Sequence, residues 1–313
     1  MKENEINLVP LYMFGSLSSL EAILDTWTLK ISLARDVNDP TENIPQLSND
    51  QNLFAYWESF KDKLTPYFCF SRDGFSPQMW TNYADASRGF CLKFLFPLVR
   101  CKEKVPPKKG EKDKRIAYQL LPMVKKNLNL NQTDLPHWEN IYYTEDRPIV
   151  DLSENDEEIK RSIDCMLFYK GKDWSYEEEV RCLCSPEMAV AANRNCITYS
   201  WPLRFLKSIY LGSEADCSVQ YIKTKLNMNT NRTAQISENW LMEMNLIDEI
   251  EVEKMGYDME RYLFVPSSDV ETLLISEKRG VKKSAGESPK NDSMLITYTE
   301  IDFLPKERTV KES

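Results

Sequence analysis

The stretch GFCLKFLFP, residues 89–97, is the clearest strand in the sequence and the best starting point for predicting the fold. Side chains of a strand point alternately to its two faces, so its aromatic and leucine positions are predicted to share a core-facing side. These positions are Phe90, Leu92, Phe94 and Phe96. A helix over 79–84 is predicted before it, preceded by the aromatic strand PYFCFS, residues 66–71. The segment therefore predicts a strand-helix-strand block.

The N-terminal region repeats this order. A short aromatic strand over 11–14 is followed by Ser18 and Glu21, which have the spacing of a capping box and predict the start of a helix. Alternating apolar residues over 29–33 then predict a half-buried strand that ends in a turn at 38–40. The first half of the chain thus contains two blocks of one kind.

The remaining sequence predicts further helices and strands around these blocks. We expect an α+β domain, with a bent or split mixed β-sheet flanked by helices, over residues 1–230, and a smaller, partly flexible C-terminal appendage over residues 231–313. Helices are expected at 53–64, 116–128, 154–169 and 215–226, strands through Cys184 and at 206–212 and 295–304, and polar loops at 101–115 and 277–293.

Composition limits the classes of function. The chain has 313 residues, 42% of them hydrophobic, and a net charge of -9, which argues against a general nucleic-acid binder because that role needs a basic face. No apolar run is long enough to cross a membrane and no secretion signal is visible, so we expect a cytoplasmic protein with no membrane partner. Eight scattered cysteines indicate reduced, mostly buried thiols.

The single histidine, His137, restricts the available chemistry. It lies in DLPHWEN beside a proline, so we interpret it as a surface or loop residue without catalytic duty. A Ser-His-Asp or Cys-His apparatus would have to use it, and a histidine-rich zinc site cannot be built. Catalysis would therefore depend on carboxylates, tyrosine, serine, lysine or arginine.

The segment WSYEEEVR, residues 174–181, concentrates such groups. Read as a strand, it places Glu177, Glu179 and Arg181 on one face, where one of the two carboxyl groups should resist ionisation. That arrangement suits a site that meets developing positive charge or a hydroxyl proton. Two other readings stay open: a solvent-exposed strand whose charges pair in water, and a helix that scatters them.

Three stretches resemble the signatures of the bacterial family known as domain of unknown function 2971. They are residues 11–42, 68–94 and 170–181, and 206–212 resembles the closing strand of that family. The order of the blocks is in turn similar to the ADP-ribosyltransferase superfamily. That resemblance implies an ADP-ribosyltransferase-like fold and NAD as substrate, with no metal.

Carried over by position, the resemblance implies roles for individual residues. Glu179, helped by Glu177, would be the catalytic carboxylate. Met13 stands where the superfamily has a histidine or arginine that grips NAD, and Arg35 could take its place. The residues implied in NAD binding are Tyr12, Ser16, Arg35, Ser71, Trp80, Tyr83 and Arg181.

Three functions follow from this reading. The first is an ADP-ribosyltransferase-like protein that transfers ADP-ribose to an unknown protein or nucleic-acid acceptor, or cleaves NAD, as a toxin or phage-defence component. The second is a catalytically inactive binding or regulatory module with a protein partner on its C-terminal third. The third is a metal-dependent nuclease that uses Asp39, Glu42 and Glu177.

Overall fold

The computed structural model places the two predicted blocks within a sheet that contains a closed barrel. It describes residues 5–37, 42, 46–47, 64–101, 116–128, 136–151, 155, 162, 165–193, 196–229, 250–258, 263–267 and 297–300. The predictions for 38–40, 53–64, 101–115, 154–169 and 277–293 fall wholly or largely outside these residues.

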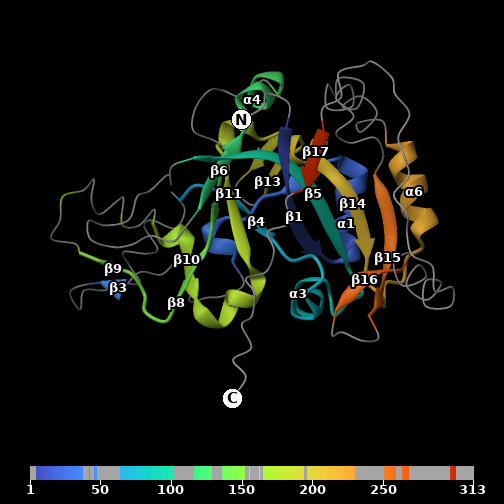
Figure 1. Cartoon of the computed structure of the whole chain (residues 1–313), viewed down its shortest axis with the longest axis horizontal. Coiled ribbons are helices and arrows are strands. Elements are labelled where there is room, and N and C mark those ends of the chain that lie inside the picture. The colour runs from blue at the N-terminus through green and yellow to red at the C-terminus, as the bar shows by residue number, and fades with distance from the viewer. Residues whose placement is uncertain are drawn as a thin grey trace.

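Six antiparallel strands form the barrel (Figure 1). In order around it they are β1 (Glu5–Gly15), β4 (Tyr67–Ser71), β11 (Glu179–Leu183), β7 (His137–Asn140), β6 (Ala117–Leu120) and β5 (Phe90–Cys101). The barrel closes because β1 pairs with β4 on one side and with β5 on the other. A closed sheet of this kind leaves no free strand edge within the ring.

Further strands extend the sheet beyond the barrel. The long strand β5 pairs with β6 over 98–101 and with β14 (Leu206–Leu211) over 90–94. Strands β15 (Glu251–Tyr257) and β16 (Phe264–Pro266) continue from β14, and β17 (Thr297–Glu300) pairs with β1. The smaller sheets are β2 (Leu29–Lys30) with β12 (Ala191–Asn193) and β13 (Cys196–Tyr199), β8 (Tyr142–Thr144) with β10 (Tyr169–Gly171), and β3 (Gln46–Leu47) with β9 (Ile149–Val150).

Helices are few in the described part of the chain. They are α1 (Leu17–Thr26), α3 (Pro77–Tyr83), α4 (Pro122–Asn127) and α6 (Val219–Met228), with short 3-10 turns between strands. None of these helices is long and apolar enough to span a bilayer.

The predicted α+β, ADP-ribosyltransferase-like fold is therefore wrong. The chain is mostly β and encloses a barrel, whereas the prediction was a bent or split sheet flanked by helices. Part of the error lies at 116–128, where a helix was predicted and strand β6 precedes the short helix α4. Another part lies at β7, which was read as a turn around His137; that histidine is buried, not on the surface. These two strands complete the ring.

Helix α1 forms where it was predicted but begins earlier. Its N-cap is Ser16, whose hydroxyl accepts a hydrogen bond from the backbone N–H of Ser19 at 3.3 Å. The predicted capping box of Ser18 and Glu21 is thus wrong by two residues. Its apolar face is buried as the spacing predicted, with Leu20, Ile23 and Leu24 in the core.

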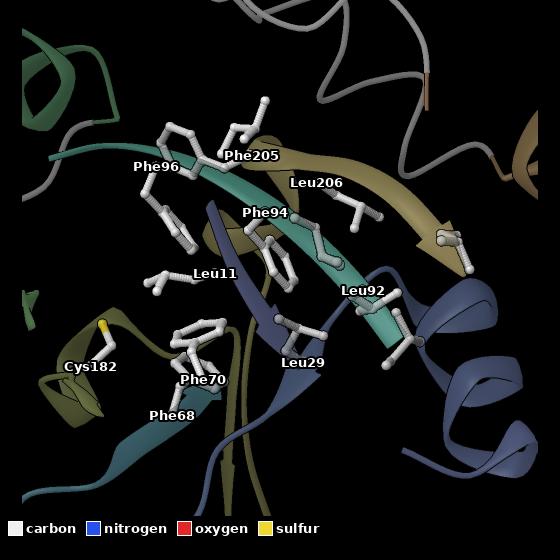
Figure 2. Packing of buried hydrophobic residues seen from close by; sticks show 14 of the residues in the cluster. Leu11, Leu29, Phe68, Phe70, Leu92, Phe94, Phe96, Cys182, Phe205 and Leu206 are labelled. Carbon is white, nitrogen blue, oxygen red and sulfur yellow. The ribbon is translucent and has the colours of Figure 1, made fainter. Parts of the chain in front are cut away.

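Aromatic side chains fill the barrel (Figure 2). Phe70 on β4 lies 5.5 Å, centroid to centroid, from both Phe94 and Phe96 on β5. Because β4 and β5 are not neighbours in the ring, these contacts cross its interior. Trp138 of β7 completes the group at 5.4 Å from Phe96. The inner face is therefore a packed core, and polar residues of the same strands point outward.

Candidate functional site

The candidate site lies on the outer face of the barrel, where β1, β4 and β11 run side by side. Tyr12 pairs in register with Ser71, and Ser71 pairs in register with Glu179, so these three residues form a row across the strands. Their neighbours Phe70 and Val180 face the packed interior. Strand alternation thus separates an apolar inner side from a polar outer side.

The segment 174–181 is only partly the strand that was predicted. A 3-10 turn, η4 (Lys172–Glu177), is followed by Glu178 with φ of 44°, and the strand starts at Glu179. The Ser71 hydroxyl donates a 2.6 Å hydrogen bond to the backbone carbonyl of Glu177 and helps to hold the turn against β4. Glu179 and Arg181 share a face as predicted, while Glu177 reaches it from the turn.

Neither of the two alternative readings of this segment holds. Glu177 and Glu179 are each 4% exposed and Arg181 is fully buried, so the charges do not face bulk water. The helical reading fails as well, because residues 179–183 are extended. A buried charge is tolerated only when it is paired and hydrogen-bonded. The partners of these three side chains therefore determine the properties of the site.

A cavity of about 220 Å³ opens at this place, which we call the acidic pocket. Its polar lining includes Glu42, Lys170, Glu177, Glu179, Ser71 and Cys69, and its aromatic and apolar walls include Tyr12, Phe14, Met79, Tyr83 and Trp174. The lining comes from segments far apart in the chain, since β1, β4, α3 and the 170–179 region all contribute. Aromatic walls around a few polar groups are typical of a small-molecule site.

Lys170 connects the three carboxylates of the acidic pocket. Its ammonium nitrogen lies 2.5 Å from Oε2 of Glu177, 3.2 Å from Oε2 of Glu179 and 3.4 Å from Oε2 of Glu42. The same nitrogen lies 5.2 Å from the ring of Trp174. Burial lowers the pKa of Lys170, but the charges of Glu179, Glu42 and Glu177 outweigh this effect and raise it. Lys170 is therefore a permanent cation at neutral pH.

Arg181 lies beneath the pocket and carries the second positive charge. Its Nε donates to Oε1 of Glu179 at 2.7 Å, and its Nη2 donates to Glu42. Nη1 donates to the backbone carbonyl of Leu167 at 2.7 Å, and the guanidinium lies 4.5 Å from the ring of Tyr67. The fork of arginine suits such multiple pairing in a dry environment.

The carboxyl groups of Glu177 and Glu179 have opposite pKa shifts. Burial tends to raise the pKa of Glu179, but the charges of Arg181 and Lys170 and the hydrogen bond from Arg181 lower it to about 2. Burial raises the pKa of Glu177 above its ordinary value, although Lys170 and Tyr83 oppose the shift. When the pKa values of two carboxyl groups in one cavity are shifted in opposite directions, the two groups can take different roles. One stays ionised and the other can hold a proton.

Two tyrosine hydroxyls lie beside the two glutamates, one bonded to a carboxylate and the other to a backbone N–H. Tyr83, at the end of α3, donates to Oε1 of Glu177, and burial together with this bond raises the pKa of Tyr83. The hydroxyl of Tyr143 accepts the backbone N–H of Glu179 at 2.8 Å. Each catalytic candidate therefore has a phenol beside it. The hydrogen bond from Tyr83 can therefore change when Glu177 gains or loses a proton.

The structure brings together five of the residues that were assigned roles: Tyr12, Ser71, Tyr83, Glu177 and Glu179 all line the acidic pocket. Arg181 lies behind the pocket wall and contacts Glu179 from there. Three others do not line the pocket: Ser16 caps α1, Arg35 lies in the short 3-10 turn Ala34–Asp36, and the fully buried Trp80 donates its indole N–H to the carbonyl of Gly74.

Two members of the site were not recognised from the sequence. Lys170 was given no role and Glu42 only that of a metal ligand, yet they complete the ionic cluster with Glu177 and Glu179. The one available signal was their presence in the stretches that carry the family resemblance, at 11–42 and 170–181. Nothing in local periodicity links residue 42 to residue 181, because that contact depends on the barrel.

Fold and site together define a mostly β protein whose barrel carries a buried ionic pocket on its outer face. Residues 79–182, from α3 to β11, match the family model described as "Protein of unknown function (DUF2971)", which confirms the resemblance to that family. The match includes Tyr83, Lys170, Glu177 and Glu179. No curated protein and no solved structure matches the chain.

Proposed function

We propose that the acidic pocket binds the nicotinamide riboside end of NAD and cleaves the bond between nicotinamide and ribose, passing ADP-ribose to an acceptor or to water. The observation that carries the proposal is the opposite tendency of Glu177 and Glu179 to hold a proton within one cavity. The proposal rests on this chemistry and not on the fold, since the fold is not that of an ADP-ribosyltransferase.

The reaction needs negative charge near ribose and a group that accepts one proton. As the bond breaks, its electron pair leaves with nicotinamide and positive charge develops on the ribose ring. Glu179 remains ionised and would stabilise that charge. Glu177, bonded to Tyr83, would accept the proton of the attacking water or acceptor. Atoms and charge then balance without another reactant.

The walls of the pocket suit a flat aromatic group. Tyr12, Phe14 and Trp174 surround the cavity, and aromatic faces attract a cationic ring such as the pyridinium of NAD. The volume of about 220 Å³ is below the 300–1,000 Å³ typical of whole small-molecule sites. The pocket would therefore hold one end of a dinucleotide, with the adenine end outside it.

A binding or regulatory module is the second candidate, and one observation favours it. Lys170 and Arg181 already neutralise most of the charge of the three carboxylates. A site whose groups are all paired can serve recognition without chemistry. This candidate predicts a stable protein complex and no turnover of NAD.

The nuclease proposal has less support from the geometry. Glu42 and Glu177 do line one cavity, but the ammonium of Lys170 lies between their carboxylates. Among the described residues no group of three or more acidic, histidine or cysteine side chains is arranged to hold a metal ion, and Asp39 lies outside them. Magnesium-dependent degradation of a nucleic acid would revive this proposal.

The test is release of nicotinamide from NAD by the full chain, followed by chromatography, together with calorimetry of NAD binding. We expect Glu177→Gln to lower the rate by about 10²–10⁴-fold while NAD still binds, because a general base is lost and the shape is kept. Glu145→Gln is the matched control, since Glu145 is exposed, does not line the acidic pocket and pairs with the exposed Lys172.

Two outcomes would overturn the proposal. One is the absence of both NAD binding and nicotinamide release in the unaltered protein. The other is unchanged turnover in Glu177→Gln. A protein complex recovered under the first outcome would support the binding module.

A further inference from the structure

A second group of reactive side chains lies away from the acidic pocket. The thiol of Cys101, at the end of β5, is 3.9 Å from Nδ1 of His137, and Nε2 of the same ring is 2.7 Å from Oε1 of Glu139. We call these three residues the thiol cluster. None of them lines the acidic pocket.

The barrel itself builds the thiol cluster. Cys101 pairs in register with Ala117 on β6, and Ala117 pairs in register with Glu139 on β7, so the three residues face the same side. This is the outer side, because Trp138 and Tyr118 on the same strands face the aromatic core. The small side chain of Ala117 leaves room above β6 for the ring of His137, which reaches across to Cys101.

The hydrogen bonds orient the imidazole for one task. As a carboxylate, Glu139 accepts a hydrogen bond from Nε2–H, which selects the tautomer in which Nδ1 carries a lone pair toward the thiol. A base held in this way by a third group is the arrangement that activates a nucleophile. The separation of 3.9 Å between Sγ of Cys101 and Nδ1 of His137 is at the outer limit for a hydrogen bond to sulfur. Such contacts are often longer in unliganded sites than during the reaction.

We propose that Cys101 is the reactive thiol of this chain and that it exchanges with small disulfides. Cys101 passes its proton to Nδ1 of His137, and the thiolate attacks one sulfur of the disulfide. The S–S bond breaks, a mixed disulfide forms on Cys101, and the released thiolate takes the proton back from His137. No other oxidant or reductant is required.

Burial favours Cys101 over the other cysteines. Glu139 is fully buried and His137 is 4% exposed, which stabilises their pairing, while Cys101 is half-buried and accessible. Four other thiols are buried, namely Cys91, Cys165, Cys182 and Cys184. Cys69 is exposed to the acidic pocket, but burial of its surroundings and the charge of Glu179 raise its pKa, which disfavours the thiolate.

Charged side chains on the elements next to the thiol cluster come from β7, β11 and α4. Glu139 lies on β7, and Arg181 of β11 is in register with it. On the α4 side, Lys125 lies 3.3 Å from the side-chain oxygen of Gln119, which is in register with His137. Arg181 and Lys125 lie on the elements next to the ring, and positive neighbours favour a thiolate.

The experiment measures thiol exchange at each cysteine of the full chain with the aromatic disulfide 5,5'-dithiobis(2-nitrobenzoate), read by peptide mass spectrometry. We expect Cys101 to react at least tenfold faster at pH 7 than Cys196 and Cys217, which are also half-buried and serve as internal controls. We expect His137→Gln to remove this advantage and leave the rates of the two control thiols unchanged.

A pH profile keeps the proposal testable if His137→Gln does not fold. In the unaltered protein the reaction of Cys101 should reach half its maximal rate well below pH 8.5, the ordinary pKa of a cysteine, and at a lower pH than the reactions of the two control thiols. Equal rates at the three thiols, or matching pH profiles, would overturn the proposal.

Discussion

The interior of the barrel and the acidic pocket on its outer face are built from the same strands by opposite physics. Inside, Phe70, Phe94 and Phe96 fill the space with rings in edge and stacked contact. Outside, Glu179 and Arg181 alternate with the residues that face the core and form a buried ionic pair. One residue of shift along β11 would exchange the two faces.

The two regions differ in how much they contribute to stability. Burial of apolar area stabilises the folded state by about 25 cal/mol per Å², so the packed interior is explained by its contribution to stability. Burial of ions costs several kcal/mol per charge, and the mutual attraction of the ions at best repays this cost. The acidic pocket, with three carboxylates and two cations, is therefore not explained by stability. We attribute it to binding or chemistry.

The largest effect is expected when the ionic pocket loses its deepest cation. Arg181→Met should lower the free energy of unfolding by about 4 kcal/mol, because Glu42 and Glu179 remain buried without their guanidinium. Urea denaturation at pH 7 measures it. The loss should shrink as the pH falls toward 4, because without Arg181 the pKa of Glu179 rises and the carboxyl group becomes neutral.

The exposed pair of Arg88 and Asp85 provides the control for Arg181. Both side chains are more than half exposed, so Arg88→Met should leave the stability unchanged within error. A loss of similar size in both variants would mean that arginine content, and not the buried pairing, determines the effect.

A smaller effect is expected in the barrel interior. Replacing Leu11, which is 1% exposed on β1, with alanine should lower the free energy of unfolding by about 3 kcal/mol, because apolar burial is lost and a cavity is left behind. The loss should be the same at pH 4 and pH 7, because no ionisable group is involved. Urea denaturation at the two pH values checks this. A strong pH dependence would show that the two faces are coupled.

The sequence predicted individual elements of the fold better than their assembly. The alternation over 89–97 and the spacing of α1 identify β5 and the helix correctly, since these are local patterns. The barrel was missed because β1 contributes to two pairings at once, and no local pattern reports that. The short strands β6 and β7, each of four residues, carry too little periodicity to be distinguished from a helix start or a turn.

The part of the candidate site that lies in one charge-rich segment was predicted from the sequence. The charged residues that come from distant segments were missed. Three glutamates in a row, residues 177–179, drew attention to the right place. Glu42 and Lys170 could not be linked to them, because their contacts join segments that are brought together only when the sheet closes. Glu178 has a left-handed backbone conformation with φ of 44°, so the chain turns there and Glu177 lies outside the predicted strand.

Burial also changes the choice of test variant. The resemblance makes Glu179 the catalytic carboxylate and would suggest Glu179→Gln as the test variant. Glu179 pairs with both Arg181 and Lys170, so its neutralisation would leave buried cations short of a partner and would lower stability. Glu177, which pairs with Lys170 and Tyr83 at the pocket wall, separates catalysis from folding more cleanly.

The smallest expected effect concerns the proton of Glu177. Its pKa is raised by burial, so the folded state holds this proton more tightly than the unfolded state, and stability is lost as the pH rises through the folded pKa. Glu177→Gln should remove that loss. Melting temperatures of the two proteins at several pH values between 4.5 and 7.5 should therefore diverge, with the unaltered protein falling further as the pH increases.

Tyr83→Phe sharpens the same measurement in the opposite direction. The hydrogen bond from Tyr83 lowers the pKa of Glu177, so its removal should raise that pKa further and extend the fall in stability to higher pH. The stability change linked to the Glu179 carboxyl group lies between its ordinary pKa and its folded pKa of about 2, so it affects at most the acidic end of this range. If the pH curves of all three proteins run parallel, Glu177 does not hold a proton differently in the folded state, and the acid and base roles assigned to the acidic pocket fail.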